Sequence, residues 1–154
     1  MKPNLEKMKL LTRDLRDGKE YPRSPRQKLA GYVLAARAVD KCRAVLAGQE
    51  GDYHSNCPLD KRWLKFAGID YDVFRSFVAT GATDAEIDSW IHENAKKRSR
   101  AEIIGWNNKE RDMRLSDLPS ETQEFMEEYI AKFVPHNRVI YHWFDVYDLE
   151  EGRL

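Results

Sequence analysis

The chain has 154 residues, of which 42% are hydrophobic and 34% are charged. This length and composition fit one globular domain that buries a core. The 26 basic and 26 acidic residues give a net charge of zero, which argues against a general binder of nucleic acids or membrane surfaces. Two cysteines are too few for a disulfide framework, and no apolar stretch resembles a secretory signal or a membrane span. We therefore expect a reduced, cytoplasmic protein.

Capping patterns predict a mainly α fold. Ser or Thr followed three residues later by Glu or Gln satisfies two orphan amides in the first turn of a helix. This pattern occurs four times, at residues 24–27, 83–86, 99–102 and 120–123. We predict a single compact multi-helix domain with one long central helix.

In chain order, residues 1–22 are expected to form an N-terminal extension with a short helix, and residues 23–154 the helical domain. The central helix is predicted from about residue 25 to 47, with Gly48 as its stop. Short helices are predicted at 58–67, ending at Gly68, and after Asp70, ending before Gly81. The C-terminal helical part spans 116–154. Its segment 139–147 fits helical and strand spacing alike, and the short-range periodicity favours a helix.

Charge is unevenly distributed along the chain. Residues 1–30 and 96–114 carry net charges of +5 and +4, whereas residues 70–95 and 115–154 carry −5 and −6. The interpretation we favour is that oppositely charged faces meet inside the fold or across a homodimer. The alternative is that basic and acidic surfaces bind different partners.

Cys57 is the sharpest chemical feature of the sequence. It directly precedes Pro58, which is typical of the first residue of a helix, and a thiol there faces the positive end of the helix dipole. His54 could act as its base, whereas the negative charge of Asp60 would oppose the thiolate. His54 and Cys57 could also supply two metal ligands, but no second compact pair follows, so we predict no metal and no cofactor.

Charged residues interrupt the predicted central helix. We expect them to form a solvent-exposed strip, with Asp40 and Arg43 close enough to pair. The alternative is that these charged residues, Arg37, Asp40, Lys41 and Arg43, line the wall of a ligand pocket, because charges on a mostly buried helix need partners. Tyr53 is a further candidate for ligand binding beside Asp40 and Arg43.

A basic cluster overlaps the start of the third capping pattern and includes Lys97, Arg98 and Arg100. Together with free helix amides, such residues bind anions, and a nearby aromatic side chain extends this to single-stranded nucleic acid. A solvated linker explains the cluster more simply.

Several segments resemble the bacterial domain-of-unknown-function family 5069 over roughly residues 22–108. They are Ser24-Pro25-Arg26, Leu29-Ala30-Gly31-Tyr32, residues 38–44, Leu46-Ala47-Gly48, Cys57-Pro58-Leu59-Asp60, Phe66-Ala67-Gly68-Ile69-Asp70 and Gly81-Ala82-Thr83-Asp84. The C-terminal third matches only loosely. The resemblance implies kinship and supplies no catalytic residues to transfer.

Two hypotheses for function remain. The one we favour is a non-enzymatic binding module for a protein or a small anionic ligand, with membranes and nucleic acids not expected as partners. The alternative is an enzyme or redox-sensing protein that uses Cys57 with His54 and Asp60.

Overall fold

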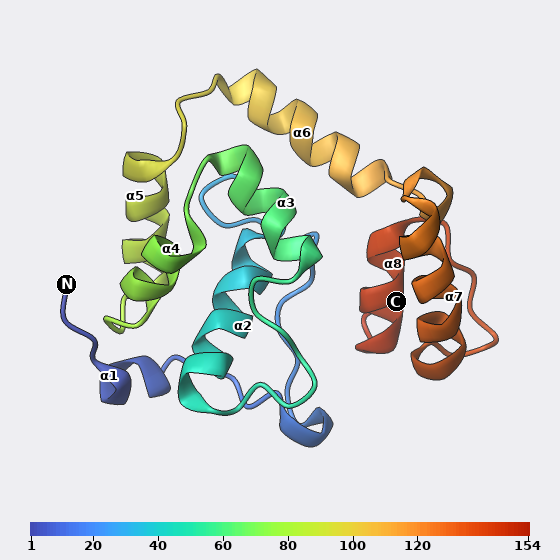
Figure 1. Ribbon diagram of the computed structural model, residues 1–154, viewed down its shortest axis with the longest axis horizontal. Coiled ribbons are helices and arrows are strands. Elements are labelled where there is room, and N and C mark those ends of the chain that lie inside the picture. The colour runs from blue at the N-terminus through green and yellow to red at the C-terminus, as the bar shows by residue number, and fades with distance from the viewer. The chain divides into compact units, whose positions relative to one another are not determined.

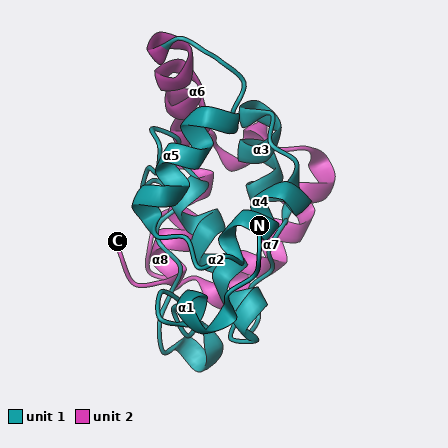
Figure 2. Ribbon diagram, turned by 90° about the vertical axis from the view of Figure 1, so that its left-hand side faces the viewer, with its two compact units in different colours: residues 1–99 teal, residues 100–154 magenta.

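The computed structural model describes residues 1–154 and contains helices but no β-strand. The chain divides into two compact units, residues 1–99 and residues 100–154, which Figure 2 shows in different colours. The predicted all-α fold is confirmed. The single long central helix is not observed, because even the longest helix has only 14 residues.

The first unit contains five α-helices and one 3-10 helix (Figure 1). They are α1 (Leu5–Lys9), η1 (Arg16–Gly18), α2 (Ala35–Ala47), α3 (Pro58–Ala67), α4 (Tyr71–Val78) and α5 (Asp84–Asn94). Helix α2 contacts α1, α3 and α4, and its first ten residues are all buried. It is therefore the central helix of this unit, although it is shorter than predicted.

The segment before α2 is not helical, although the sequence predicted a helix from about residue 25. Its backbone is left-handed at Ala30 (φ 53°) and at Leu34 (φ 73°), a conformation that interrupts a right-handed helix. Just before α2, Leu29 and Tyr32 exchange two backbone hydrogen bonds of 3.0 Å. Neither alanine nor leucine signals a left-handed turn, so the sequence pattern could not show this break.

Helices α3, α4 and α5 follow their local sequence signals. Pro58 is the first residue of α3, and Gly68 ends that helix in a left-handed conformation (φ 69°). The Asp70 carboxylate accepts hydrogen bonds from two amides in the first turn of α4. Thr83 and Glu86 form the predicted capping box at the start of α5. These three helices therefore begin close to where the sequence placed them.

An aromatic cluster holds α3 and α4 against the segment before α2. Trp63 and Phe74 are fully buried, and their rings meet edge to face with centroids 5.4 Å apart. Tyr32 contacts the Trp63 ring in the same way at 6.5 Å. Burying one such side chain stabilises a fold by roughly 1.5–3 kcal/mol, so this cluster is a major part of the core.

Helix α1 packs onto the same unit. The side chain of Met8 in α1 has no exposed surface, and the backbone amide of Asn4 donates to the carbonyl of Ala79 at 2.8 Å. Gly81 lies directly beneath the side chain of Lys7. The domain boundary predicted at residue 22 stays a prediction, but these contacts place α1 within the first compact unit.

The second unit contains α6 (Arg100–Asp112), η2 (Leu115–Asp117), α7 (Ser120–Phe133) and α8 (Trp143–Glu150). Helices α7 and α8 lie side by side: the Tyr129 ring contacts Tyr147, and its hydroxyl donates to Glu150. The amide of Trp143 donates to the carbonyl of Met113 at 2.8 Å, which joins the start of α8 to the end of α6.

The segment 139–147 is helical from Trp143 onward, as the periodicity favoured. The carboxylate of Asp145 accepts hydrogen bonds from the backbone amides of Tyr141 and His142, which fixes the helix start. Phe144 is fully buried within this helix. None of the helices combines the length and apolar character needed to cross a membrane.

Candidate functional site

Cys57 lies at the N-terminal cap of α3, where the sequence placed it. Its backbone is extended (φ −75°, ψ 171°), but its side chain makes no capping hydrogen bond to the helix amides. The sulfur instead accepts a hydrogen bond of 3.0 Å from the Nζ of Lys41. The helix dipole is therefore not the only influence on this thiol, because a cation from α2 lies directly beside it.

Lys41 also binds Asp60, so that three chemically different groups meet. Its Nζ lies 2.9 Å from Oδ1 of Asp60, and the other carboxylate oxygen accepts the backbone amide of Asn56 at 2.9 Å. The side chains of Lys41 and Asp60 are each only 4% exposed, whereas Cys57 is half-buried. We call Lys41, Cys57 and Asp60 the thiol cluster.

The thiol cluster places its ammonium between the sulfur and the carboxylate. A neighbouring lysine favours the thiolate form of a cysteine, and a carboxylate opposes it. Asp60 also affects the thiol indirectly, because its ion pair with Lys41 holds the ammonium beside the sulfur. His54 is exposed, and no hydrogen bond or ion pair joins it to Cys57. The contact between Lys41 and Cys57 was not predicted from the sequence, because sixteen positions separate the two residues.

Cys42, the other cysteine, is chemically quiet. It is fully buried, and burial, followed by the negative charge of Asp60, raises the pKa of Cys42 to about 12. The two cysteines are not joined by a disulfide. Any thiol chemistry at neutral pH therefore belongs to Cys57.

The charged residues of α2 are buried, so the expected solvent-exposed strip is wrong. Arg37, Asp40, Lys41 and Arg43 each have between 3% and 4% of their surface exposed. Each has a partner inside the first unit, which is what burial of a charge requires.

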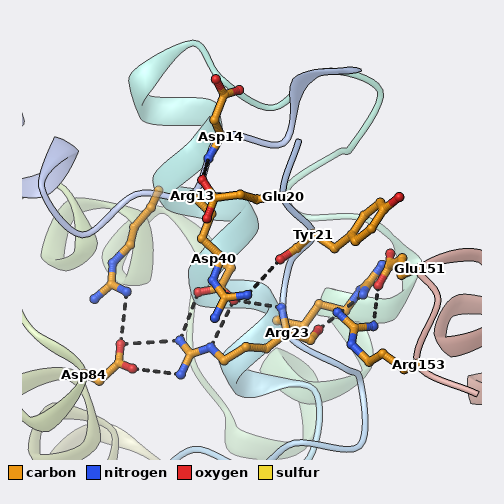
Figure 3. Close-up of polar contacts among 11 residues, drawn as sticks. Arg13, Asp14, Glu20, Tyr21, Arg23, Asp40, Asp84, Glu151 and Arg153 are labelled. Atoms are coloured by element: carbon orange, nitrogen blue, oxygen red, sulfur yellow. Dashed lines mark hydrogen bonds and ion pairs between the residues drawn. The ribbon is translucent and has the colours of Figure 1, made fainter. Parts of the chain in front are cut away.

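Asp40 binds Arg23, which lies before α2 (Figure 3). The carboxylate accepts the backbone amide of Arg23 at 2.8 Å and its Nε and Nη2 at 3.0 Å. The same guanidinium reaches Asp84 at the start of α5, with Nη1 2.8 Å from Oδ2. We call Arg23, Asp40, Asp84 and Arg43 the arginine–aspartate network.

Arg43 completes this network from the other side. Its Nη1 lies 3.0 Å from Asp84, and its Nη2 donates to the carbonyl of Ala82 at 3.0 Å. Burial disfavours ionisation of Asp84, but the hydrogen bond and charge of Arg23 and the charge of Arg43 outweigh it and hold the Asp84 pKa below its ordinary value. The expected pairing of Asp40 with Arg43 is replaced by these longer-range contacts.

Tyr53 lies apart from the network and contacts Arg37, whose guanidinium carbon is 5.7 Å from the ring centroid. The predicted ligand set of Asp40, Arg43 and Tyr53 therefore has its charged members engaged with other side chains. Their role in ligand binding stays a prediction.

The basic cluster is partly used to hold helix ends. The Nζ of Lys97 donates to the carbonyl of His92 at 2.9 Å, near the end of α5. Arg98 donates twice to the carbonyl of Phe66, and its guanidinium lies 4.0 Å from the centre of that ring. Arg100 is exposed and begins α6 in the second unit.

A shallow, open hollow of about 440 Å³ lies on α4 and α5. Phe77 and Trp90 form one wall, with their rings stacked at 5.0 Å and 9°. Glu86 and Glu93 are exposed at the hollow, and Ala85 and Ser89 complete its lining. No pattern in the sequence pointed to this surface.

The second unit exposes aromatic side chains of its own. Phe125 is 62% and Phe133 41% exposed on α7, and both rings contact Tyr129 between them. Trp143 and Phe144, at the start of α8, are buried. Nowhere do three or more His, Cys, Asp or Glu side chains gather in a way that could hold a metal ion.

These observations define a small helical protein with two largely buried clusters of charged residues in its first unit. The sequence matches the family described as Domain of unknown function (DUF5069) over residues 19–153. The protein therefore belongs to this family, as the resemblance predicted, and the match extends through α6, α7 and α8. A comparison with curated proteins found no match.

Proposed function

We propose that the protein is a binding module whose α4–α5 hollow receives an arginine-bearing segment of another protein. The observation that carries the proposal is the combination of stacked aromatic rings and exposed carboxylates in one open hollow. An arginine side chain stacks on the face of a tryptophan and pairs with a carboxylate at the same time, so it complements both features.

Charge around the hollow supports a basic partner. Residues 70–95 carry six acidic and one basic residue, and they include all of α4 and α5. The carboxylate of Glu86 already accepts a hydrogen bond from the backbone amide of Thr83 and lies 3.8 Å from the Nζ of Lys7. No hydrogen bond or ion pair engages the side chain of Glu93. Glu93 is thus the carboxylate most ready to receive a guanidinium.

A small anionic ligand at the basic cluster has less support. Two of its cations, Lys97 and Arg98, donate hydrogen bonds to backbone carbonyls near the ends of α5 and α3. For the compartment, two free cysteines suit the reducing cytoplasm, which we retain as part of the proposal.

A peptide selection tests the binding proposal directly. Short random peptides displayed on phage are selected on the full chain, and a synthetic copy of a selected peptide is then titrated by fluorescence anisotropy. We expect enrichment of arginine beside apolar residues, and up to about fivefold weaker binding to Glu93→Gln from the loss of one ion pair of an exposed glutamate. Trp90→Leu should weaken binding similarly, because it removes the stacking surface.

Glu128→Gln, a change at an exposed glutamate of α7, is the matched control and should bind as the wild type does. Unselective enrichment, or equal affinity of Glu93→Gln and Glu128→Gln, would contradict the proposal. If the wild-type chain sediments as a dimer that Trp90→Leu converts to a monomer, the occupant is a second copy and the separate partner is wrong.

A second candidate function is thiol chemistry at Cys57. The observation that favours it is the 3.0 Å contact between Cys57 and the buried Lys41. Lys41 takes the place that the sequence hypothesis gave to His54. The pH dependence of alkylation by iodoacetamide tests this candidate: Cys57 should react faster at neutral pH in the wild type than in Lys41→Met.

A further inference from the structure

We propose that hydrogen peroxide joins Cys57 to Lys41 through a covalent sulfur–nitrogen bond. This inference rests on the second candidate function, thiol chemistry at Cys57, and is independent of the binding proposal. The sulfur and the amine nitrogen are already 3.0 Å apart, which is the separation of reacting atoms in a near-attack arrangement.

The surroundings of the pair favour reaction between these two groups. Cys57 is half-buried, whereas Cys42 is fully buried, so Cys57 is the cysteine that is more open to a small oxidant. The side chain of Lys41 is 4% exposed and is held by Asp60 at 2.9 Å, so its amine stays beside the sulfur. Such positioning raises the effective concentration of the amine far above that of competing solutes.

In the first step, the sulfur of Cys57 attacks one oxygen of hydrogen peroxide. A sulfur–oxygen bond forms, the oxygen–oxygen bond breaks, and the leaving hydroxide takes the thiol proton to become water. The sulfur is oxidised to a sulfenic acid, and the peroxide is reduced.

In the second step, one proton of the Lys41 ammonium passes to the carboxylate of Asp60, its neighbour at 2.9 Å. The freed amine attacks the sulfur of Cys57, so a sulfur–nitrogen bond forms and the sulfur–oxygen bond breaks. Hydroxide leaves with a second proton of the amine as water. The product is a sulfenamide, the class of compound that sulfenic acids form with nearby nitrogens.

The link would change the electrostatics of the thiol cluster. Lys41 loses its positive charge, and Asp60, which is 4% exposed, is left protonated beside it. Asp60 also accepts the amide of Asn56, so the loop before α3 feels the change directly. Oxidation is thereby converted into a local structural response.

The test uses the reduced full chain, treated with hydrogen peroxide, quenched with catalase and analysed by intact mass and non-reducing peptide mapping. The link lowers the mass by two hydrogen atoms and joins the peptides that contain residues 41 and 57. Lys41→Arg keeps a cation beside Asp60 but cannot supply a neutral amine, so there Cys57 should stop at a sulfenic acid that dimedone traps.

Cys42→Ala separates the link from a disulfide of equal mass, and it should retain the loss of two hydrogens. The inference is overturned if that loss disappears in Cys42→Ala or persists in Lys41→Arg. Oxidation of wild-type Cys57 to sulfenic or sulfinic acid without the link overturns the inference alone. Complete resistance of Cys57 to peroxide overturns both the inference and the thiol function.

Discussion

Replacing Asp40 by alanine tests whether the arginine–aspartate network stabilises the first unit. The Asp40 carboxylate is 3% exposed and accepts three hydrogen bonds from Arg23. In the variant, the guanidinium of Arg23, which is 13% exposed, keeps only its contact with Asp84. The variant therefore loses the contacts between Arg23 and Asp40 but keeps the ion pair between Arg23 and Asp84.

The expected loss follows from these contacts. Removing one partner of a buried ion pair costs roughly 3–5 kcal/mol, and the retained Asp84 contact points to the lower end of that range. We expect the free energy of unfolding to fall by about 3 kcal/mol, a large part of the 5–15 kcal/mol typical of a domain. Urea denaturation followed by far-ultraviolet circular dichroism measures this change.

Asp52→Ala is the matched control, because Asp52 is an exposed loop aspartate of the same unit. It should leave the unfolding midpoint nearly unchanged. In a double-mutant cycle, adding Arg23→Met to Asp40→Ala should cost less than Arg23→Met alone, since the arginine has already lost most of its partners. Equal losses for Asp40→Ala and Asp52→Ala would refute the reasoning.

Three further predictions concern single positions. Gly51→Ala should destabilise the protein more than Gly48→Ala. Both glycines have positive φ, but only at Gly51 would an added Cβ meet a backbone oxygen, that of Leu15 at 2.8 Å. Equal unfolding midpoints of the two variants in urea would contradict this prediction. Because the Asp84 pKa is held low, its stabilising contribution is fully present above the ordinary aspartate pKa of about 3.9 and is lost as pH falls below it. Acid denaturation of Asp84→Asn should therefore show a shallower fall of stability in that range than the wild type, and parallel curves would count against it. Cys42, whose pKa is raised to about 12, should resist alkylation at neutral pH until the chain is unfolded, and modification in the native state, detected by peptide mapping, would contradict its burial.

The sequence predicted the parts of the fold that depend on local chemistry. Gly68, Asp70 and Thr83 each act within a few residues, and the helix boundaries near them are where the sequence placed them. The break before α2 depends on left-handed backbone at Ala30 and Leu34, residues that carry no such preference. Tertiary packing decided the conformation there.

The candidate site was predictable only in part, and for a related reason. The position of Cys57 at the start of a helix could be read from Pro58 beside it. Its contact with Lys41 joins residues sixteen positions apart, and the contact of Arg23 with Asp84 joins residues 61 positions apart. A pairing expected at helical spacing, Asp40 with Arg43, gave way to these distant partners. Charged residues on a buried helix indicate that they have partners, but the sequence does not show which residues those partners are.

Helix α1 has a practical consequence for anyone who shortens this protein. The family match begins at residue 19, so its boundary excludes α1. Cutting the chain there would remove Met8 from the core, leave the carbonyl of Ala79 without its donor, and uncover Gly81 beneath Lys7. The boundary of the sequence family and the boundary of the folding unit are therefore different, and a piece trimmed to the former exposes apolar surface that promotes aggregation.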